Sequence, residues 1–195
     1  MVRRTAKGYR VRRATLRDLG VLVRHRRGMW RDISKSTEAQ FDAADPVWRR
    51  WARDRMRNGT LIAFVAVAPD GHAAASGCVW LRRNQPMPRL PDPTVPYLLS
   101  MYTEPADRGR GLATKIVEAA LRWSRAKGFP IMILHASQYG RSLYEKLGFE
   151  RTWEMRVGLV KPTRASSRGR ATPRGPRRSS AASRRRGSRG SRARR

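Results

Sequence analysis

The sequence has little of the residue types that build several common kinds of site. Its one cysteine, Cys78, excludes a disulfide within the chain and indicates a reducing compartment. Its three histidines are scattered without metal-ligand spacing, so we expect no metal. Its longest apolar run, residues 61–68, is far shorter than a membrane span, and residues 19–23 are too few for a signal-peptide core. These absences predict a cytoplasmic protein without a transmembrane segment.

Acidic residues are also scarce, with 14 Asp and Glu against 44 Lys and Arg and a formal net charge of +30. Residues 161–195 hold fourteen of the cations, no acid and almost no apolar side chain larger than alanine. Such a segment cannot bury a core, so we expect one domain over 1–160 and a disordered basic tail over 161–195. Three interpretations of the tail stay open: no specific role, a non-specific nucleic-acid tether, or contact with anionic membranes or proteins.

Periodicity of apolar residues predicts strands and helices that alternate along the first 160 residues. Thr15 is a suitable N-cap for the first helix, and the pair Asp45-Pro46 is typical of the start of a second. Turn residues separate two apolar runs that predict a hairpin. The expected elements are a strand (9–14), a helix (16–33), a helix (46–57), a hairpin (61–68 and 73–81), a Pro-rich loop (84–96), a strand (97–103), a helix (112–127), a strand (131–134), a short helix ending at Gly148 and a final strand (152–160).

The most informative stretch joins the strand 97–103 to the helix that begins at residue 112. Gly109 and Gly111 let a ligand approach the backbone closely, and free amides at a helix start attract an anion. A Rossmann turn needs a third glycine where Thr114 stands, and a P-loop needs Lys where Leu112 stands. The remaining pattern predicts a diphosphate-binding turn of another kind.

Two motifs together resemble those of the GNAT N-acetyltransferases. The first is Arg-x-x-Gly-x-Ala at Arg108, Gly111 and Ala113, with the family's usual proline at Pro105. The second spans residues 140–149, where a helix with Leu-Tyr-Glu-Lys ends in Gly-Phe.

The second motif has a structural interpretation as well. Tyr139, Leu143 and Leu147 share one face of a helix and would pack on a core, with Gly148 as the C-terminal cap. Both interpretations can hold together.

The resemblance implies an α/β (α+β) GNAT fold over about residues 9–160. Its mixed, mostly antiparallel sheet would be flanked by helices, and its central parallel strands would splay apart to admit acetyl-CoA. Backbone amides would hold the diphosphate and the pantetheine arm. The cofactor-binding residues implied in this way are Met101, Thr103, Arg108, Gly109, Arg110, Gly111, Leu112, Ala113 and Ser137, the last in place of the family's usual asparagine.

The resemblance also implies that Tyr144 protonates the CoA thiolate as general acid, with core packing as the alternative role. Some relatives carry a glutamate as general base where this chain has Tyr97, so no carboxylate carries over. Glu104 and His135 are weak candidates for the base, and a water relay is equally compatible with the sequence.

The function that we expect is direct acetyl transfer from acetyl-CoA to a primary amine of a small molecule or a protein. Trp30, Asp32 and Tyr97 are candidates for the acceptor pocket, Asp32 because a carboxylate attracts a cationic amine. The alternative is a non-catalytic acyl-CoA-binding scaffold or sensor with a nucleic-acid-binding tail. The sequence leaves the acceptor and the oligomeric state open, with a homodimer as one option.

Overall fold

The computed structural model describes residues 7–86, 88 and 92–155 of the 195-residue chain. The chain divides after Arg151, and the unit before this point carries the whole of the described sheet. Residues 152–155 have no regular secondary structure, so the first part of the strand expected over 152–160 is absent. The rest of that strand and the basic segment 161–195 lie outside the described residues.

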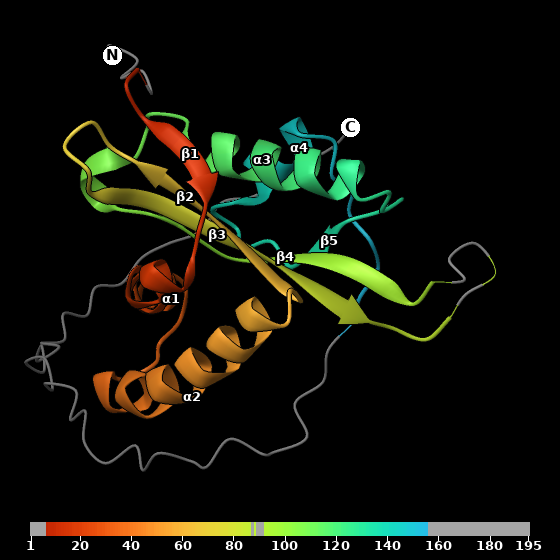
Figure 1. Cartoon of the computed structure of the whole chain (residues 1–195), viewed down its shortest axis with the longest axis horizontal. Helices are drawn as coiled ribbons and strands as arrows, with labels where there is room; N and C mark the ends of the chain where they lie inside the picture. The colour runs from red at the N-terminus through yellow and green to blue at the C-terminus, as the bar shows by residue number, and fades with distance from the viewer. Residues whose placement is uncertain (1–6, 87, 89–91, 156–195) are drawn as a thin grey trace, which may run out of the picture. The chain divides into compact units, whose positions relative to one another are not determined.

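The described secondary structure follows the expected order and forms one five-stranded sheet, β1-β2-β3-β4-β5 (Figure 1). All neighbouring strands are antiparallel except β4 and β5, which run parallel. This confirms the mixed, mostly antiparallel sheet predicted from the sequence. The elements are β1 (Arg10–Arg13), the 3₁₀ turn η1 (Leu16–Asp18), α1 (Leu19–Ile33), α2 (Glu38–Arg57), β2 (Leu61–Val67), β3 (Ala73–Arg83), β4 (Thr94–Thr103), the 3₁₀ turn η2 (Pro105–Asp107), α3 (Leu112–Ala126), β5 (Ile133–Leu134) and α4 (Arg141–Lys146).

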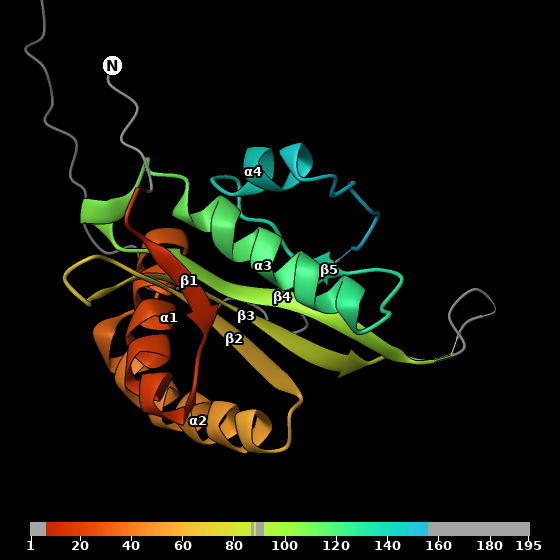
Figure 2. The same cartoon turned by 45° about the horizontal axis from the view of Figure 1, so that its top comes forward.

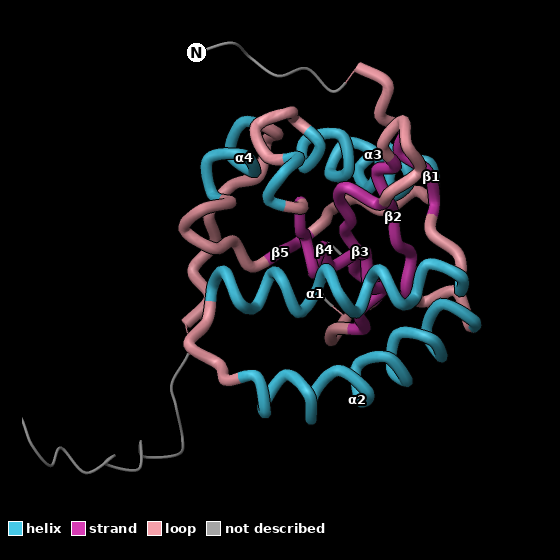
Figure 3. Tube along the Cα trace, turned by 90° about the vertical axis from the view of Figure 1, so that its left-hand side faces the viewer, coloured by secondary structure: helices cyan, strands magenta, loops and turns pink. Residues whose placement is uncertain are grey.

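Helices cover both faces of the sheet, α1 and α2 on one side and α3 and α4 on the other (Figures 2 and 3). One core lies under α3, where Ile116 and Val117 are fully buried against β2 and β3. The other lies under α1 and α2, where Leu22 and Ala52 pack against Val65. No helix in the described part of the chain combines the length and the apolarity needed to cross a bilayer.

The second helix begins eight residues earlier than the sequence predicted. Thr37 is its N-cap, and a capping box with Gln40 satisfies amides that the helix start leaves free. Pro46 therefore lies inside the helix rather than in its first turn. Asp45 accepts a hydrogen bond from Arg27 Nε at 2.6 Å instead of capping, which ties α2 to α1. The expected start at Asp45-Pro46 was wrong, because this capping box and this ion pair outweigh the preference of proline for the first turn of a helix.

Two boundaries, at the starts of β4 and β5, also differ from expectation. The Pro-rich loop ends earlier, because β4 begins at Thr94 and buries Val95 and Pro96 in the sheet. The strand expected over 131–134 is reduced to Ile133–Leu134, and Ile131 is 45% exposed. Only the inner end of this apolar run pairs with β4, and the outer end meets solvent.

Candidate functional site

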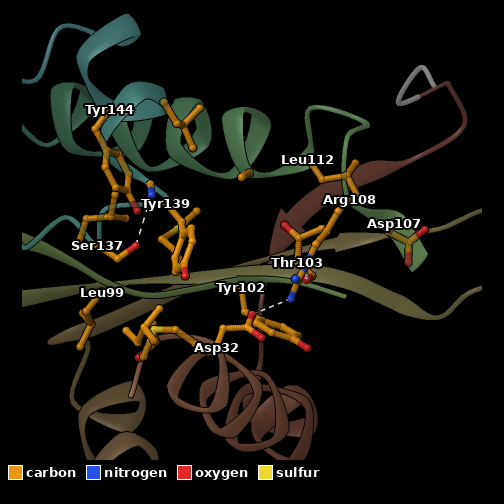
Figure 4. Close-up of a pocket in the computed structure, with 18 of the residues that line it drawn as sticks. Asp32, Leu99, Tyr102, Thr103, Asp107, Arg108, Leu112, Ser137, Tyr139 and Tyr144 are labelled. Atoms are coloured by element: carbon orange, nitrogen blue, oxygen red, sulfur yellow. Dashed lines mark hydrogen bonds and ion pairs between the residues drawn. The ribbon is translucent and has the colours of Figure 1, made fainter. Parts of the chain in front are cut away.

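A cavity of about 620 Å³ opens where β4 and β5 separate. Their parallel pairing ends at Leu98 and Leu134, after which the two strands diverge. Residues 98–103 of β4 form its floor (Figure 4). Three walls surround this floor: the α3 wall (Arg108, Gly109, Gly111, Leu112, Ala113), the α1 wall (Met29, Asp32, Ile33) and the α4 wall (Ser137, Tyr139, Gly140, Leu143, Tyr144).

The floor carries a β-bulge at Ser100. The pairing of β3 with β4 shifts register there, and Ser100 has a φ of 52°, which is unusual for a residue other than glycine. Gly77 on β3 makes room for the bulge, because a Cβ there would lie 2.3 Å from Met101 Sδ. A bulge turns backbone groups away from the strand ladder, so the floor of this cavity is the place where β4 can offer them to a ligand.

The α3 wall is built from backbone conformation. Gly109 and Gly111 have φ values of 75° and 78°, in the left-handed region that favours glycine. Gly111 is the N-cap of α3 and has no side chain to cap the free amides of the first turn. Apart from the neighbouring backbone, no atom of the described residues lies within 4 Å of a Cβ built on either glycine, so the space that faces these amides is open. This arrangement suits a diphosphate group, whose negative charge the start of a helix favours.

Arg110 is the one predicted cofactor residue of this stretch that does not line the cavity. Its guanidinium lies 5.6 Å from the centre of the Tyr9 ring, and its Nε lies 3.8 Å from Asp107. The side chain therefore supports the outer side of the turn.

The α4 wall places Tyr144 at the cavity. Gly140 makes room for its ring, since a Cβ there would lie 2.9 Å from Tyr144 Cε2. Burial raises the pKa of Tyr144, which keeps the phenol protonated and able to donate. Ser137 also lines the cavity, and its Oγ accepts a hydrogen bond from the Gly140 amide at 3.3 Å (Figure 4).

The core stripe expected on this helix is only partly formed. Leu143 and Leu147 pack against the core, but Tyr139 is 72% exposed and lines the cavity. The helix begins at Arg141, so Tyr139 precedes it and does not follow its periodicity. Gly148 has a φ of 86° and ends the helix as predicted.

The α1 wall carries an ion pair that joins it to the α3 wall. Asp32 Oδ2 lies 2.6 Å from an Arg108 guanidinium nitrogen, and Arg108 Nε donates to the carbonyl of Thr103 at 3.0 Å. The Tyr102 ring lies beneath this guanidinium and directly against Gly28 of α1. Asp32 is therefore at the cavity as predicted, but a cation of this chain already occupies it.

Glu104 does not line the cavity, and its carboxylate lies next to a buried histidine of α1. His25 is fully buried, with Nδ1 2.9 Å from Ser76 Oγ and Nε2 3.2 Å from Glu104 Oε1, the second contact without hydrogen-bond alignment. Burial lowers the pKa of His25, so the ring stays neutral at neutral pH. Glu104 does not line the cavity, whereas His135, the other candidate base, does.

Tyr97 and Trp30 do not line the cavity. Tyr97 reaches it indirectly, because its hydroxyl lies 2.7 Å from His135 Nδ1. Trp30 is 37% exposed, and its ring lies 5.9 Å from the Arg26 guanidinium, which also lies over Trp48 of α2. Helical spacing placed Trp30 near the apolar face but could not tell which edge of that face meets the cavity.

Asp107 is a buried carboxylate that the sequence did not single out. It ends η2 directly before the turn and has a side chain only 5% exposed. Its Oδ1 accepts a 2.5 Å hydrogen bond from the Tyr9 hydroxyl, and its Oδ2 lies 2.9 Å from His72 Nε2. His72 Nδ1 lies 2.6 Å from Asp70 Oδ1, so this ring has a carboxylate at each nitrogen.

The other unpredicted participants are His25, Tyr102 and Ser100. The spacing of Leu22, His25 and Met29 would have placed His25 on the buried face of α1. No local pattern marks the contacts of Asp107 or the bulge at Ser100, because both depend on strands far away in the sequence.

Comparison with known proteins agrees with this geometry. A model of the acetyltransferase (GNAT) family matches residues 12–149. Among proteins of curated function, none matches this chain.

Three solved structures share the fold. A GCN5-related N-acetyltransferase from Ralstonia eutropha JMP134 is 25% identical with a TM-score of 0.72, and the match covers 78% of this chain and 99% of that one. A predicted acetyltransferase from Clostridium acetobutylicum, solved with acetyl-CoA, is 25% identical with a TM-score of 0.69 over 77% and 96% of the chains. AAC(6')-Iy in complex with a bisubstrate analogue of CoA is 20% identical with a TM-score of 0.59 over 78% and 98%.

The family match covers most of the chain, including β4, the turn before α3 and the helix that carries Tyr144. The strand order, the parting of β4 and β5 and the open helix start independently agree with it. The chain is an acyltransferase that belongs to the GNAT acetyltransferase family.

Proposed function

We propose that this protein transfers the acetyl group of acetyl-CoA directly to a primary amine of a small molecule or a protein. The observation that carries the proposal is the uncapped start of α3, which faces the same cavity as Tyr144. The structural neighbour solved with acetyl-CoA, at 25% identity, supports the choice of donor.

Acetyl-CoA, when bound, supplies an activated thioester, and the chain binds and orients it. The first-turn amides of α3 hold the diphosphate, and Gly109 and Gly111 keep side chains out of its way. Backbone groups beside the bulge at Ser100 orient the pantetheine arm along β4. Ser137 offers one hydroxyl at the far end of the cavity.

Tyr144 donates a proton to the leaving thiolate. A thiol is a stronger acid than a phenol, but a buried phenol close to the sulfur can still deliver its proton as the bond breaks. With its raised pKa, Tyr144 is in its protonated form across the physiological range, as a donor must be.

His135 accepts the proton of the amine. Its ring lies at the cavity, whereas Glu104 is turned toward His25. In this role Nδ1 donates a hydrogen bond to the Tyr97 oxygen at 2.7 Å, and Nε2 is the nitrogen that accepts the proton. In this arrangement the Tyr97 hydroxyl accepts from Nδ1 and takes no part in the transfer itself.

The acceptor is a small amine or a protein N-terminus rather than a polycation. Asp32 is the acidic residue of the α1 wall, and Arg108 neutralises it at 2.6 Å. The chain as a whole carries a formal charge of +30, which repels a polycationic substrate.

The test combines the full chain with acetyl-CoA and a panel of amines, with release of free CoA thiol and the acetylated product as readouts. Cys78 is 1% exposed and does not interfere with a thiol reagent. We expect amine-dependent thiol release, and His135→Gln should reduce it while acetyl-CoA still binds. Failure of the full chain to bind acetyl-CoA would overturn the proposal.

We propose separately that the basic segment 161–195 binds nucleic acid without sequence preference, because its fourteen cations have no acid among them. Deletion of this segment should remove salt-sensitive binding of an oligonucleotide duplex and leave acetyl transfer intact. Unchanged binding of the duplex after the deletion would overturn this proposal.

A further inference from the structure

His72 lies between two carboxylates that belong to different parts of the fold. Asp70 precedes it in the turn between β2 and β3, and Asp107 ends η2 next to the diphosphate-binding turn. His72 Nδ1 lies 2.6 Å from Asp70 Oδ1, and Nε2 lies 2.9 Å from Asp107 Oδ2. The ring therefore connects the tip of a hairpin to the start of the α3 wall.

The protonation state follows from hydrogen-bond chemistry. A neutral imidazole carries one N–H, so it can donate to one carboxylate and must turn a lone pair toward the other. An imidazolium donates to both. The hydrogen bonds that the ring donates to Asp107 and, second in size, to Asp70 raise the pKa of His72 above its ordinary value of 6.5.

The carboxylate of Asp107 is well placed to transmit the protonation state of His72 to the diphosphate-binding turn. Asp107 is nearly buried, and its remaining oxygen accepts from Tyr9 at 2.5 Å, with Arg110 Nε at 3.8 Å. Among the described residues, Tyr9, His72 and Arg110 are the groups that face Asp107, and Asp70 and Asp107 are those that face His72. Gly109, with its left-handed φ, follows two residues later.

We propose that His72, as an imidazolium between Asp70 and Asp107, is a positioning residue that fixes the diphosphate-binding turn, so that acetyl-CoA binds more weakly once His72 loses its proton. This inference rests on the proposed function. The direction of the pH dependence follows from the raised pKa of His72. The imidazolium contact with both carboxylates is complete below pH 6.5, the ordinary pKa of histidine, and it is lost as the pH rises through the higher pKa that His72 has in the folded chain.

Acetyl-CoA should be titrated into the full chain by calorimetry between about pH 5.5 and pH 8.5, the range in which histidine changes charge. Because CoA phosphates titrate in the same range, the informative quantity is the difference between wild type and variant at each pH. His72→Gln should bind about fivefold more weakly than wild type at low pH, as expected for one lost hydrogen bond, and equally well at high pH.

His72→Lys separates positioning from packing. A lysine keeps the positive charge throughout this range, so its affinity should stay at the tight level where wild type weakens. Asp54→Asn is the control, because this carboxylate of α2 is 60% exposed and lies 3.7 Å from Arg53, its ion-pair partner among the described residues. It should follow the wild-type profile.

Linkage supplies a second readout that needs no variant. If protonated His72 favours acetyl-CoA, acetyl-CoA must raise the pKa of His72 by the same free energy, and NMR of the three histidines measures this directly. A wild-type pH profile in His72→Gln, or an unchanged pKa of His72 on binding, would overturn the inference. No binding at any pH would overturn the proposed function as well.

Discussion

The α3 wall and the α1 wall face the same cavity but are held in different ways. The α3 wall depends on backbone conformation at Gly109 and Gly111 and on Asp107, whose side chain is 5% exposed. The α1 wall depends on side chains, and its link to the α3 wall is an ion pair in which Asp32 is 44% and Arg108 47% exposed. The first wall is therefore rigid and suited to a constant ligand, and the second can vary with the acceptor.

The largest expected effect leaves both walls intact. Tyr144→Phe should lower kcat about 100-fold, because it removes the proposed proton donor while the ring still fills its place beside Gly140. Calorimetry should show acetyl-CoA affinity within about twofold of wild type, since the phenol acts on the leaving thiolate. A loss of affinity with kcat unchanged would mean that Tyr144 has only a packing role.

The next effect should fall on the α3 wall alone. Gly111→Val should weaken acetyl-CoA binding about thirtyfold, because the side chain enters the space of the diphosphate and the left-handed φ disfavours it. Gly59→Val is the matched control, since Gly59 has a φ of 75° and equally open surroundings at the end of α2. If the two variants are equally destabilised in thermal melts and only Gly111→Val binds acetyl-CoA more weakly, the result would support the role of Gly111 in the α3 wall. Equal binding of acetyl-CoA by the two variants would contradict it.

The two carboxylates next to the turn should differ in their contribution to stability. Asp107→Asn should lower the free energy of unfolding by about 1.5 kcal/mol, because a buried group loses charge-assisted hydrogen bonds to Tyr9 and His72. Asp32→Asn should lower it by less than about 0.5 kcal/mol, because its ion pair is exposed. Urea unfolding measures both, and equal values would show that the two walls are equally rigid.

A further effect on stability concerns the start of α1, away from both walls, and depends on pH. The hydrogen bond from Arg12 holds the pKa of Asp18 at about 2, below its ordinary 3.8. Its contribution, about 1 kcal/mol, is present above 3.8 and is lost as the pH falls toward 2. Asp18→Asn should therefore be less stable than wild type at neutral pH and nearly equal to it at the acid end, as thermal melts would show.

Local pattern was enough to predict the order of elements and the turn before α3. Gly109 and Gly111, the row that contains Ile116, and the stop at Gly148 all lie within a few residues of the structure they produce. The second helix shows where this reasoning fails. Asp45-Pro46 has the pattern of a helix start, but the capping box at Thr37 begins the helix first.

The sequence by itself determined the order of strands and helices and the glycine turn at the start of α3, because periodicity and glycine conformation are local properties. The mixed sheet and the place of Tyr144 were implied by the resemblance of two motifs to a family. Only the tertiary structure decided that Asp32 pairs with Arg108, that Glu104 faces His25, and that Asp107 joins His72. These contacts span from 35 to 79 residues of chain, and which partners meet depends on sheet register and helix packing, which no short stretch of sequence encodes.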